Sequence, residues 1–287
     1  MALGRSMNCD TVIDSMRLLN AHGADALQIC LGPIDKQTLI NIKDEDAKIV
    51  RKARKRTKFY VVVHGKYLYN FCRPRSQAGW SWQYDLLVRE LDQASRIGAD
   101  VIIHQGKNVL GLPHTEALQN FADGVSYVLS QSAHSNKLLL ENSAHQGTEI
   151  GYSLADLIAI WELIPEEYHS RIGFCLDLCH VFVAGELDVR DPEAVQQYLV
   201  DFTEILPLDL VHFNDSNVKY EAHNDEHAAI GCGYIGNGEL NGRLAGFQVV
   251  AKFCREHDIP MILETPASTD IQPEIELVRG LAGGPAK

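Results

Sequence analysis

The chain has 287 residues, 46% hydrophobic and 22% charged, a composition typical of a globular protein with a substantial core. No apolar stretch approaches the roughly 18 residues of a membrane span, and the N-terminal segment lacks the apolar region of a secretory signal. The formal net charge of −12 is unlike that of proteins that bind nucleic acid through cationic side chains alone. The seven cysteines are scattered without a CxxC pair, which favours a reduced intracellular compartment.

Helical and strand-like segments alternate along the chain. Apolar periodicity and end signals predict helices at 10–21, 44–56, 82–97, 115–132, 154–163, 192–205 and 240–256. Short apolar runs between them predict strands at 25–30, 59–64, 101–104, 137–141, 173–177, 209–212 and 261–264. An eighth strand has to come from the segment ALGRSM, whose signal is the weakest. The alternation predicts an α/β fold, a (β/α)₈ TIM barrel with an atypical first strand, as a single domain over residues 1–287 with a frayed tail at 282–287.

Six of the apolar runs end on a residue that can bind a metal. These residues are His64, His104, Glu141, Asp177, His212 and Glu264. Successive members are 40, 37, 36, 35 and 52 positions apart, close to the thirty-odd residues of one βαβ unit. Because a closed parallel barrel gathers the carboxyl ends of its strands at one mouth, the six side chains are predicted to converge on a metal centre there.

Two further clusters add candidate ligands. His180 lies three residues after Asp177 in LDLCH, and Asp225 and His227 alternate around one residue in NDEH. Nine candidate ligands are enough for three metal ions. Imidazole and carboxylate donors without thiolates suit zinc, manganese or iron at a catalytic site better than a structural zinc site.

Phosphodiester cleavage gives a reason for three metals. Its transition state gathers negative charge on phosphoryl oxygens, requires a nucleophile from water at neutral pH and expels an alkoxide. Metals would also make the mouth cationic in an otherwise acidic protein. The basic run at 51–58 favours a solvated helix face, with its charges at the C-terminal end of the helix, over a phosphate-binding surface.

The chain resembles the endonuclease IV family of abasic-site DNA repair enzymes. The resemblance lies in VIIHQGKN, LLLENSAHQGTEIG, IGFCLDLCHVFVAGEL, LVHFNDSN, HAAIGCGYIG and MILETP, in this order, and covers most of the barrel from His64 to Glu264. It implies a trinuclear zinc enzyme that hydrolyses the phosphodiester 5′ to an abasic site, leaving a 3′-hydroxyl and a 5′-deoxyribose phosphate in base excision repair. The variants HGKYL and ICLGP look closer to viral-type members, so the expected location is the cytoplasm or nucleus, or the virion of a virus.

The resemblance also implies residue roles. His64, His104 and Glu141 would hold one zinc, and Glu141 would bridge to a second zinc that Asp177, His212 and Glu264 complete. The third zinc would be held by His180, Asp225 and His227. Glu141 and Glu264 would be catalytic, manganese is the alternative metal at one or more sites, and Tyr67 matches an aromatic residue that enters the DNA near the lesion.

Two other functions stay open at the level of sequence. Divalent-metal sugar isomerases and epimerases on similar barrels use residue types like Glu141, Asp177, His212 and Glu264, but have no need of the third-site residues. A catalytically silent binder of DNA lesions is the other alternative, because Glu226 stands where the family usually has an arginine. For the repair enzyme, the expected partner is double-stranded DNA with abasic sites, and the protein is expected to act as a monomer away from membranes. Asn142 and Asp215 are candidates for orienting the ligands.

Overall fold

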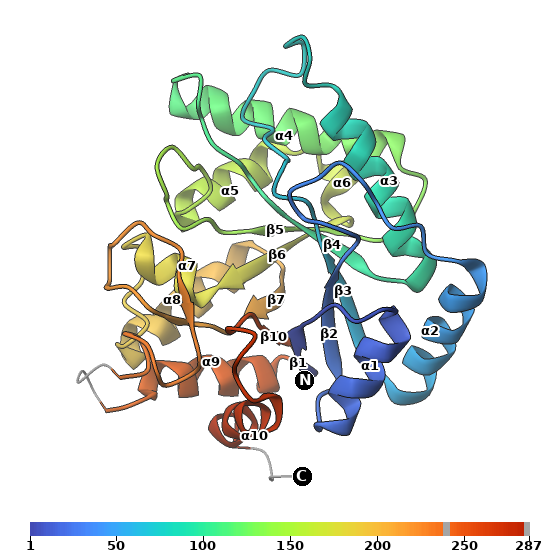
Figure 1. The fold of residues 1–287 in the computed structure, drawn as a ribbon. Coiled ribbons are helices and arrows are strands. Elements are labelled where there is room, and N and C mark those ends of the chain that lie inside the picture. Colours follow the sequence, from blue (N-terminus) through green and yellow to red (C-terminus); the bar gives the residue numbers. More distant parts are fainter. Residues whose placement is uncertain (238–241, 284–287) are drawn as a thin grey trace.

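The computed structural model describes residues 1–237 and 242–283, and within these ranges the chain forms one closed barrel of eight parallel strands (Figure 1). Around the barrel the strand order is β1, β10, β7, β6, β5, β4, β3, β2. The strands are β1 Leu3–Ser6, β2 Ala26–Cys30, β3 Tyr60–His64, β4 Asp100–His104, β5 Leu138–Glu141, β6 Ile172–Asp177, β7 Leu208–His212 and β10 Met261–Leu263. A two-stranded antiparallel hairpin, β8 Asp215–Ser216 and β9 His227–Ala228, stands outside the barrel.

Helices follow the strands and form the outer layer, as Figure 1 shows. They are α1 Val12–Ala21, α2 Asp44–Thr57, α3 Trp82–Ile97, α4 His114–Gln131, α5 Leu154–Leu163, α6 Glu166–His169, α7 Leu178–Val183, α8 Pro192–Ile205, α9 Ala245–Glu256 and α10 Ile271–Leu281. None of the helices in the described ranges is long and apolar enough to span a membrane. The eight closed parallel strands and the surrounding helices confirm the TIM barrel expected from the sequence.

The predicted helices match the observed ones closely at most ends. Three helices were not predicted: the short helices α6 and α7, and the C-terminal helix α10. The segments predicted at 82–97, 154–163 and 192–205 coincide with α3, α5 and α8. The helix predicted at 240–256 is α9, which begins at Ala245; part of its predicted first turn lies outside the described residues, as does most of the predicted tail. Helix α7 escaped prediction because all six of its residues are buried, so it shows no amphipathic period.

The first strand is real although it is short. Leu3 pairs with Met261 of β10, and Arg5 pairs with Leu27 of β2, so β1 closes the barrel. Gly4 allows the close approach: a Cβ atom there would lie 1.7 Å from the carbonyl oxygen of Ala26. The sequence signal is weak because a glycine and an arginine interrupt the apolar run that marks the other strands.

The core has two layers, which the period of two along each strand separates. One layer fills the barrel interior and the other lies between the strands and the helices. The interior layer consists of Ala26, Val62, Ile102, Leu139, Cys175, Leu210 and Ile262, one residue from each of seven strands. This layer fills the barrel below its mouth, which lies at the carboxyl ends of the strands.

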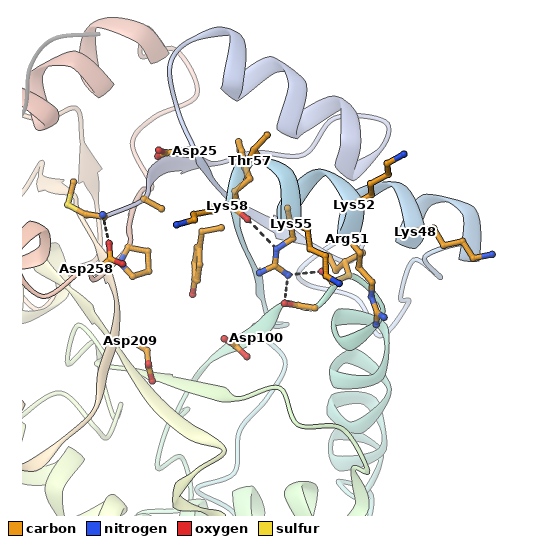
Figure 2. Close-up of a pocket in the computed structure, with 18 residues that line it drawn as sticks. Asp25, Lys48, Arg51, Lys52, Lys55, Thr57, Lys58, Asp100, Asp209 and Asp258 are labelled. Atoms are coloured by element: carbon orange, nitrogen blue, oxygen red, sulfur yellow. Dashed lines mark hydrogen bonds and ion pairs between the residues drawn. The ribbon is translucent and has the colours of Figure 1, made fainter.

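The basic run lies on α2 and its C-cap, near the amino ends of the strands (Figure 2). The candidate ligands follow the carboxyl ends of the strands, at the opposite end of the barrel. A cavity of 1280 Å³ opens there, and its lining includes Lys55 as well as Asp100 and Asp209. Arg51 donates to the carbonyl oxygen of Arg96 at 2.6 Å, and Arg54 donates to that of Ile97 at 2.7 Å. These cations therefore satisfy carbonyl groups at the C-terminal end of α3, which agrees with a helix-face role rather than a phosphate site.

Replacing Arg54 by Met is expected to lower the free energy of unfolding by about 1–3 kcal/mol, because carbonyl groups at the end of α3 lose a cationic donor. The expected loss would be measured by urea denaturation. Arg56, which is exposed on the same helix, provides the matched control, and its replacement by Met should change stability by less than about 0.5 kcal/mol. Equal effects of the two substitutions would contradict the role given to Arg54.

Candidate metal centre

Six of the candidate ligands lie two residues after the interior residue of their strand, toward the mouth of the barrel. Side chains two positions apart on a strand or its immediate extension point to the same face, so a residue two places after an interior residue also points inward. Six strands place a candidate ligand at this position: His64 after Val62, His104 after Ile102, Glu141 after Leu139, Asp177 after Cys175, His212 after Leu210 and Glu264 after Ile262. The convergence inferred from sequence spacing is thus a consequence of strand register.

The first cluster lies across three neighbouring strands. His64, His104 and Glu141 each offer a donor atom within 4.8 Å of the others. The Oε2 atom of Glu141 lies 3.5 Å from Nε2 of His64 and 3.4 Å from Nε2 of His104. Register brings them together, because His104 on β4 pairs directly with Glu141 on β5.

The second cluster shares Glu141. It comprises Glu141, Asp177, His212 and Glu264, again with donor atoms within 4.8 Å of one another. Nδ1 of His212 lies 2.8 Å from Oε1 of Glu141, 3.6 Å from Oδ2 of Asp177 and 3.4 Å from Oε2 of Glu264. Since the two oxygens of Glu141 face different clusters, its carboxylate has the geometry of a bridge.

The third cluster comes from α7 and from the β8–β9 hairpin. The Asp177 carboxylate caps α7 by accepting from the backbone N–H of His180 at 2.8 Å, which fixes His180 one turn above the strand end. Oδ2 of Asp225 lies 3.2 Å from Nε2 of His180, and its Oδ1 lies 3.0 Å from Nε2 of His227. Donor atoms of Asp177, His180 and His227 also lie within 4.8 Å of one another, so this cluster adjoins the second.

The donor set fits divalent cations. Five imidazoles and four carboxylates crowd the mouth. Oε2 of Glu141 and Nε2 of His227 are buried and make no aligned hydrogen bond among the described residues, since the 3.0 Å contact of Nε2 with Asp225 does not have hydrogen-bond geometry. Buried polar atoms normally have partners, so these two atoms indicate a missing ligand. The thiol of Cys175 also lies near Glu141 and His212, but it belongs to the interior layer below the candidate ligands, and burial raises its pKa to about 12.

The electrostatics of the cluster point the same way. Burial alone lowers the pKa of the His180 imidazole, but the carboxylates of Asp177 and Asp225 outweigh burial and raise that pKa well above its ordinary value. Burial raises the pKa of Glu141, yet the neighbouring His104 and His212 hold it well below its usual range. Without a cation the carboxylates favour the protonated form of imidazoles such as that of His180, whereas bound dications would neutralise the carboxylates directly.

Two residues that hold the candidate ligands were missed from the sequence. Gln28 on β2 occupies the inward position two places after Ala26; its Oε1 lies 2.7 Å from Nε2 of His212, and its amide donates to Glu264. Asn214 donates to Oδ2 of Asp177 at 2.6 Å and accepts from the backbone N–H of Glu264 at 2.7 Å. A polar residue inside the apolar run ALQIC was the available signal for Gln28.

The two residues expected to orient ligands have different roles. Asn142 binds the backbone of Asp177 on both sides: Oδ1 accepts from the N–H at 2.7 Å, and Nδ2 donates to the carbonyl oxygen at 3.2 Å. Its own carbonyl oxygen lies 2.9 Å from Nδ1 of His180. Asp215 instead accepts backbone N–H groups from the loop at 231–236, so it shapes that loop rather than orienting a candidate ligand.

Replacing Asn214 by Ala is expected to lower metal affinity or turnover roughly 10- to 100-fold, because two candidate ligands lose their orienting partner. Metal affinity would be measured by competition with a chelating dye, and turnover by the incision assay described below. Asn120, which donates to the carbonyl oxygen of Cys72 at 3.1 Å on the outer layer, provides the control. If Asn120→Ala lowered metal affinity as much as Asn214→Ala does, the loss would reflect general destabilisation.

Tyr67 stands above the clusters at the open mouth. Its side chain is 61% exposed, and its ring centroid lies 5.4 Å from that of His64 and 5.7 Å from that of His104. Cavities of 1040 Å³ and 610 Å³ both have Tyr67 and Asp225 in their lining. An exposed aromatic ring between two cavities is well placed to meet a substrate, and its contact with DNA stays a prediction.

Glu226 lies beside the third cluster and is exposed. Its carboxylate accepts from Nδ2 of Asn224 at 2.7 Å, and its carbonyl oxygen accepts from the backbone N–H of Asn217 at 2.8 Å. The side chain is therefore tied to its own loop. The backbone around it holds Asp225 and His227 next to His180 whatever the charge at position 226.

Comparisons with known proteins place this barrel among its relatives. The family described as "Xylose isomerase-like TIM barrel" matches residues 16–281. A "Probable endonuclease 4" from Chloroflexus aurantiacus is 32% identical over 271 residues, which cover 91% of each chain. A "Putative endonuclease 4" from Acanthamoeba polyphaga mimivirus is 31% identical over 261 residues, or 88% of this chain and 80% of the relative.

The solved structures show the same fold. Endonuclease IV from Thermus thermophilus superposes with a TM-score of 0.80 over 99% of both chains at 21% identity. A D-tagatose 3-epimerase-like protein has a TM-score of 0.68 at 17% identity, over 99% of this chain and 96% of the other, so the barrel alone does not choose between these activities. The sequence matches to these relatives, which cover 88% and 91% of this chain, decide the family: the chain belongs to the xylose isomerase-like TIM barrel family and, within it, to the endonuclease IV family.

Proposed function

We propose that this protein is a zinc-dependent abasic-site endonuclease of base excision repair. It would hydrolyse the DNA phosphodiester 5′ to an abasic site in a duplex and leave a 3′-hydroxyl and a 5′-deoxyribose phosphate. The observation that carries the proposal is the third cluster, in which Asp225 lies within 3.2 Å of both His180 and His227, and these two histidines adjoin Asp177. The family membership supports the same activity, since the relatives are named endonuclease 4.

Nine side chains would hold three zinc ions, with manganese as the alternative at one or more positions. His64, His104 and Glu141 would hold the first; Glu141, Asp177, His212 and Glu264 the second; His180, Asp225 and His227 the third. When bound, the ions supply Lewis acidity that makes water a nucleophile at neutral pH and neutralises the charge that develops on the phosphoryl oxygens.

Glu141 and Glu264 would carry the catalytic roles among the chain's own residues. Glu141 is fully buried and faces two clusters, so it holds them at a fixed separation. Glu264 has a side chain that is 16% exposed and lines the cavity of 1040 Å³, so its carboxylate lies where the buried centre meets solvent. It can therefore orient the attacking water, and Gln28 and Asn214 hold it in place.

The acidic character of the chain is compatible with a DNA substrate. Three dications more than neutralise the four carboxylates of the clusters, which makes the mouth cationic where the phosphate would lie. The remaining negative charge is spread over the rest of the protein and disfavours non-specific binding of undamaged duplex. Recognition by the metal centre and by Tyr67 would then favour a distorted, lesion-bearing site.

A sugar isomerase or epimerase is the second candidate, because one structural relative is described as D-tagatose 3-epimerase-like. That reaction would use Glu141, Asp177, His212 and Glu264 and would leave the third cluster without a role. A silent lesion binder would have no use for any of the three clusters. Both alternatives thus leave buried, metal-suited groups unexplained.

The product ends test the proposal. The zinc-loaded protein would be incubated with a duplex that carries one abasic site, and the nicked product would be offered to a DNA polymerase with labelled nucleotides. Hydrolysis 5′ to the site predicts direct extension, because the 3′-hydroxyl is free. A nick that cannot be extended would indicate β-elimination instead, and conversion of ketose or aldose sugars without any nick would favour the isomerase.

A further inference from the structure

A second cavity at the mouth of the barrel is lined by aromatic side chains. A cavity of 610 Å³ lies between the loops that follow β3, β4 and β5, and its lining includes Trp80, Trp82 and Val109. The same cavity reaches the candidate metal centre, because His104 and His180 also line it. Its volume is in the range of pockets that bind small organic groups.

We infer that this cavity is a stacking site for an unstacked nucleobase of the DNA strand whose phosphodiester lies at the metal centre. This inference rests on the proposed function, since it takes the DNA substrate as given. It adds a binding site for a base next to the site of chemistry, formed by Trp80, Trp82, Tyr67 and Lys107.

Aromatic and apolar exposure concentrates at this place. Tyr67 is 61%, Val109 52% and Leu110 45% exposed, and all three lie on the loops after β3 and β4 beside the cavity. Exposed apolar groups that gather at one rim usually mark a binding surface. Because His104 and His180 line both the cavity and the candidate metal centre, a group of the substrate bound at the centre can reach the cavity.

The chemistry of the lining suits a planar base. The ring centroids of Trp80 and Trp82 lie 6.3 Å apart, and the guanidinium of Arg73 lies 4.1 Å from the Trp80 centroid. Stacking on indole rings accepts any base, because every base has a π face. The ammonium group of Lys107 lies 3.5 Å from Oε1 of Glu149, and because its side chain is 44% exposed it can turn to a neighbouring phosphate.

The walls of the cavity are fixed by hydrogen bonds between the loops. Nδ2 of Asn70 donates to the carbonyl oxygen of Lys107 at 2.9 Å, and the N–H of Asn70 donates to Oε1 of Gln83 at 2.8 Å. The N–H of Asn108 donates to the carbonyl oxygen of Thr148 at 2.8 Å. A preformed wall loses little conformational entropy when a base stacks on it.

The tryptophan positions allow a direct optical test. Trp161, the third tryptophan of the chain, stacks on His169 at a centroid distance of 3.7 Å, on the outer layer. In the Trp161→Phe protein, all tryptophan fluorescence comes from Trp80 and Trp82. We expect a duplex with one tetrahydrofuran abasic analogue to quench this fluorescence. If the quenching stays the same when each neighbouring base is removed in turn, the inference is contradicted.

A coupling experiment gives the second measurement. Binding would be measured for the zinc-loaded wild type and for Trp80→Leu/Trp82→Leu, on the tetrahydrofuran duplex and on duplexes that also lack the base 5′ or 3′ to the analogue in the same strand. Removing one of these bases should weaken binding to the wild type on the order of tenfold and leave binding to the double variant nearly unchanged. Trp80→Phe/Trp82→Phe keeps aromatic rings, so its DNA affinity should again fall when the base is removed, as in the wild type. This result would separate a loss of stacking from misfolding.

The outcomes separate this inference from the proposed function. Equal loss of affinity from base removal in the wild type and in the leucine variant, with incision retained, would overturn the stacking site and leave the endonuclease standing. If the wild type neither bound nor incised any of the duplexes, both the proposed function and the stacking site would be contradicted. Coupling at one base position, rescued by phenylalanine, would support both.

Discussion

Replacing Glu264 by Gln is expected to abolish incision while leaving DNA binding within a few-fold of the wild type. The substitution keeps the size of the side chain but removes the negative charge that faces His212 and the open cavity. Loss of the group that orients the attacking water should lower the rate of incision by roughly 10² to 10⁴-fold. The rate would be measured in single turnover with the enzyme in excess, and binding by fluorescence anisotropy.

Glu226 provides the matched control for this substitution, because it also lies at the mouth and carries the same charge. Its side chain points to its own loop, so Glu226→Gln should leave the rate of incision intact and should, if anything, tighten DNA binding. Retained turnover in Glu264→Gln would remove Glu264 from the catalytic role. A similar loss in both variants would mean that net charge at the mouth, rather than a specific ligand, controls the rate.

Replacing Asp225 by Ala is expected to reduce the bound zinc from three ions to two per chain. Asp225 lies between His180 and His227, and its loss leaves the third cluster without a charged ligand. Incision should fall by more than about 100-fold, since even the partners that orient metal ligands contribute 10- to 100-fold. Elemental analysis of protein after gel filtration would give the metal content.

The same substitution separates the two enzyme hypotheses. A sugar isomerase that uses the second cluster alone should keep its turnover in Asp225→Ala, because Glu141, Asp177, His212 and Glu264 are unchanged. Melting temperature before and after chelation provides a check on folding. Three zinc ions retained in Asp225→Ala would contradict the assignment of the third site.

Strand register explains why the convergence of so many candidate ligands could be predicted from the sequence. In a closed parallel barrel, an inward residue at the end of each strand must face the common axis, so His64, His104 and Glu141 were found from their place after apolar runs. The same rule applies to Gln28, which was overlooked because it lies inside its run and is not a metal ligand by type. Polar residues inside apolar strands therefore carry information about such centres.

Other parts of the site depend on contacts that no local pattern encodes. Asn214 binds Asp177, 37 positions before it, and Glu264, 50 positions after it, and nothing around Asn214 indicates either partner. The cavity beside Trp80 and Trp82 forms only where three loops meet, and each loop by itself is an ordinary connection. Pairings between distant segments are the features that required the structure.

The most direct test of the central claim is a single incision assay. The zinc-loaded protein would be incubated with a duplex that contains one tetrahydrofuran abasic analogue, beside an undamaged duplex, with and without prior chelation. Because the analogue cannot undergo β-elimination, a single cut on its 5′ side that chelation abolishes and zinc restores is the predicted result. Incision that survives complete removal of metal, or the absence of any cut by fully zinc-loaded protein, would contradict a metal-dependent abasic-site endonuclease.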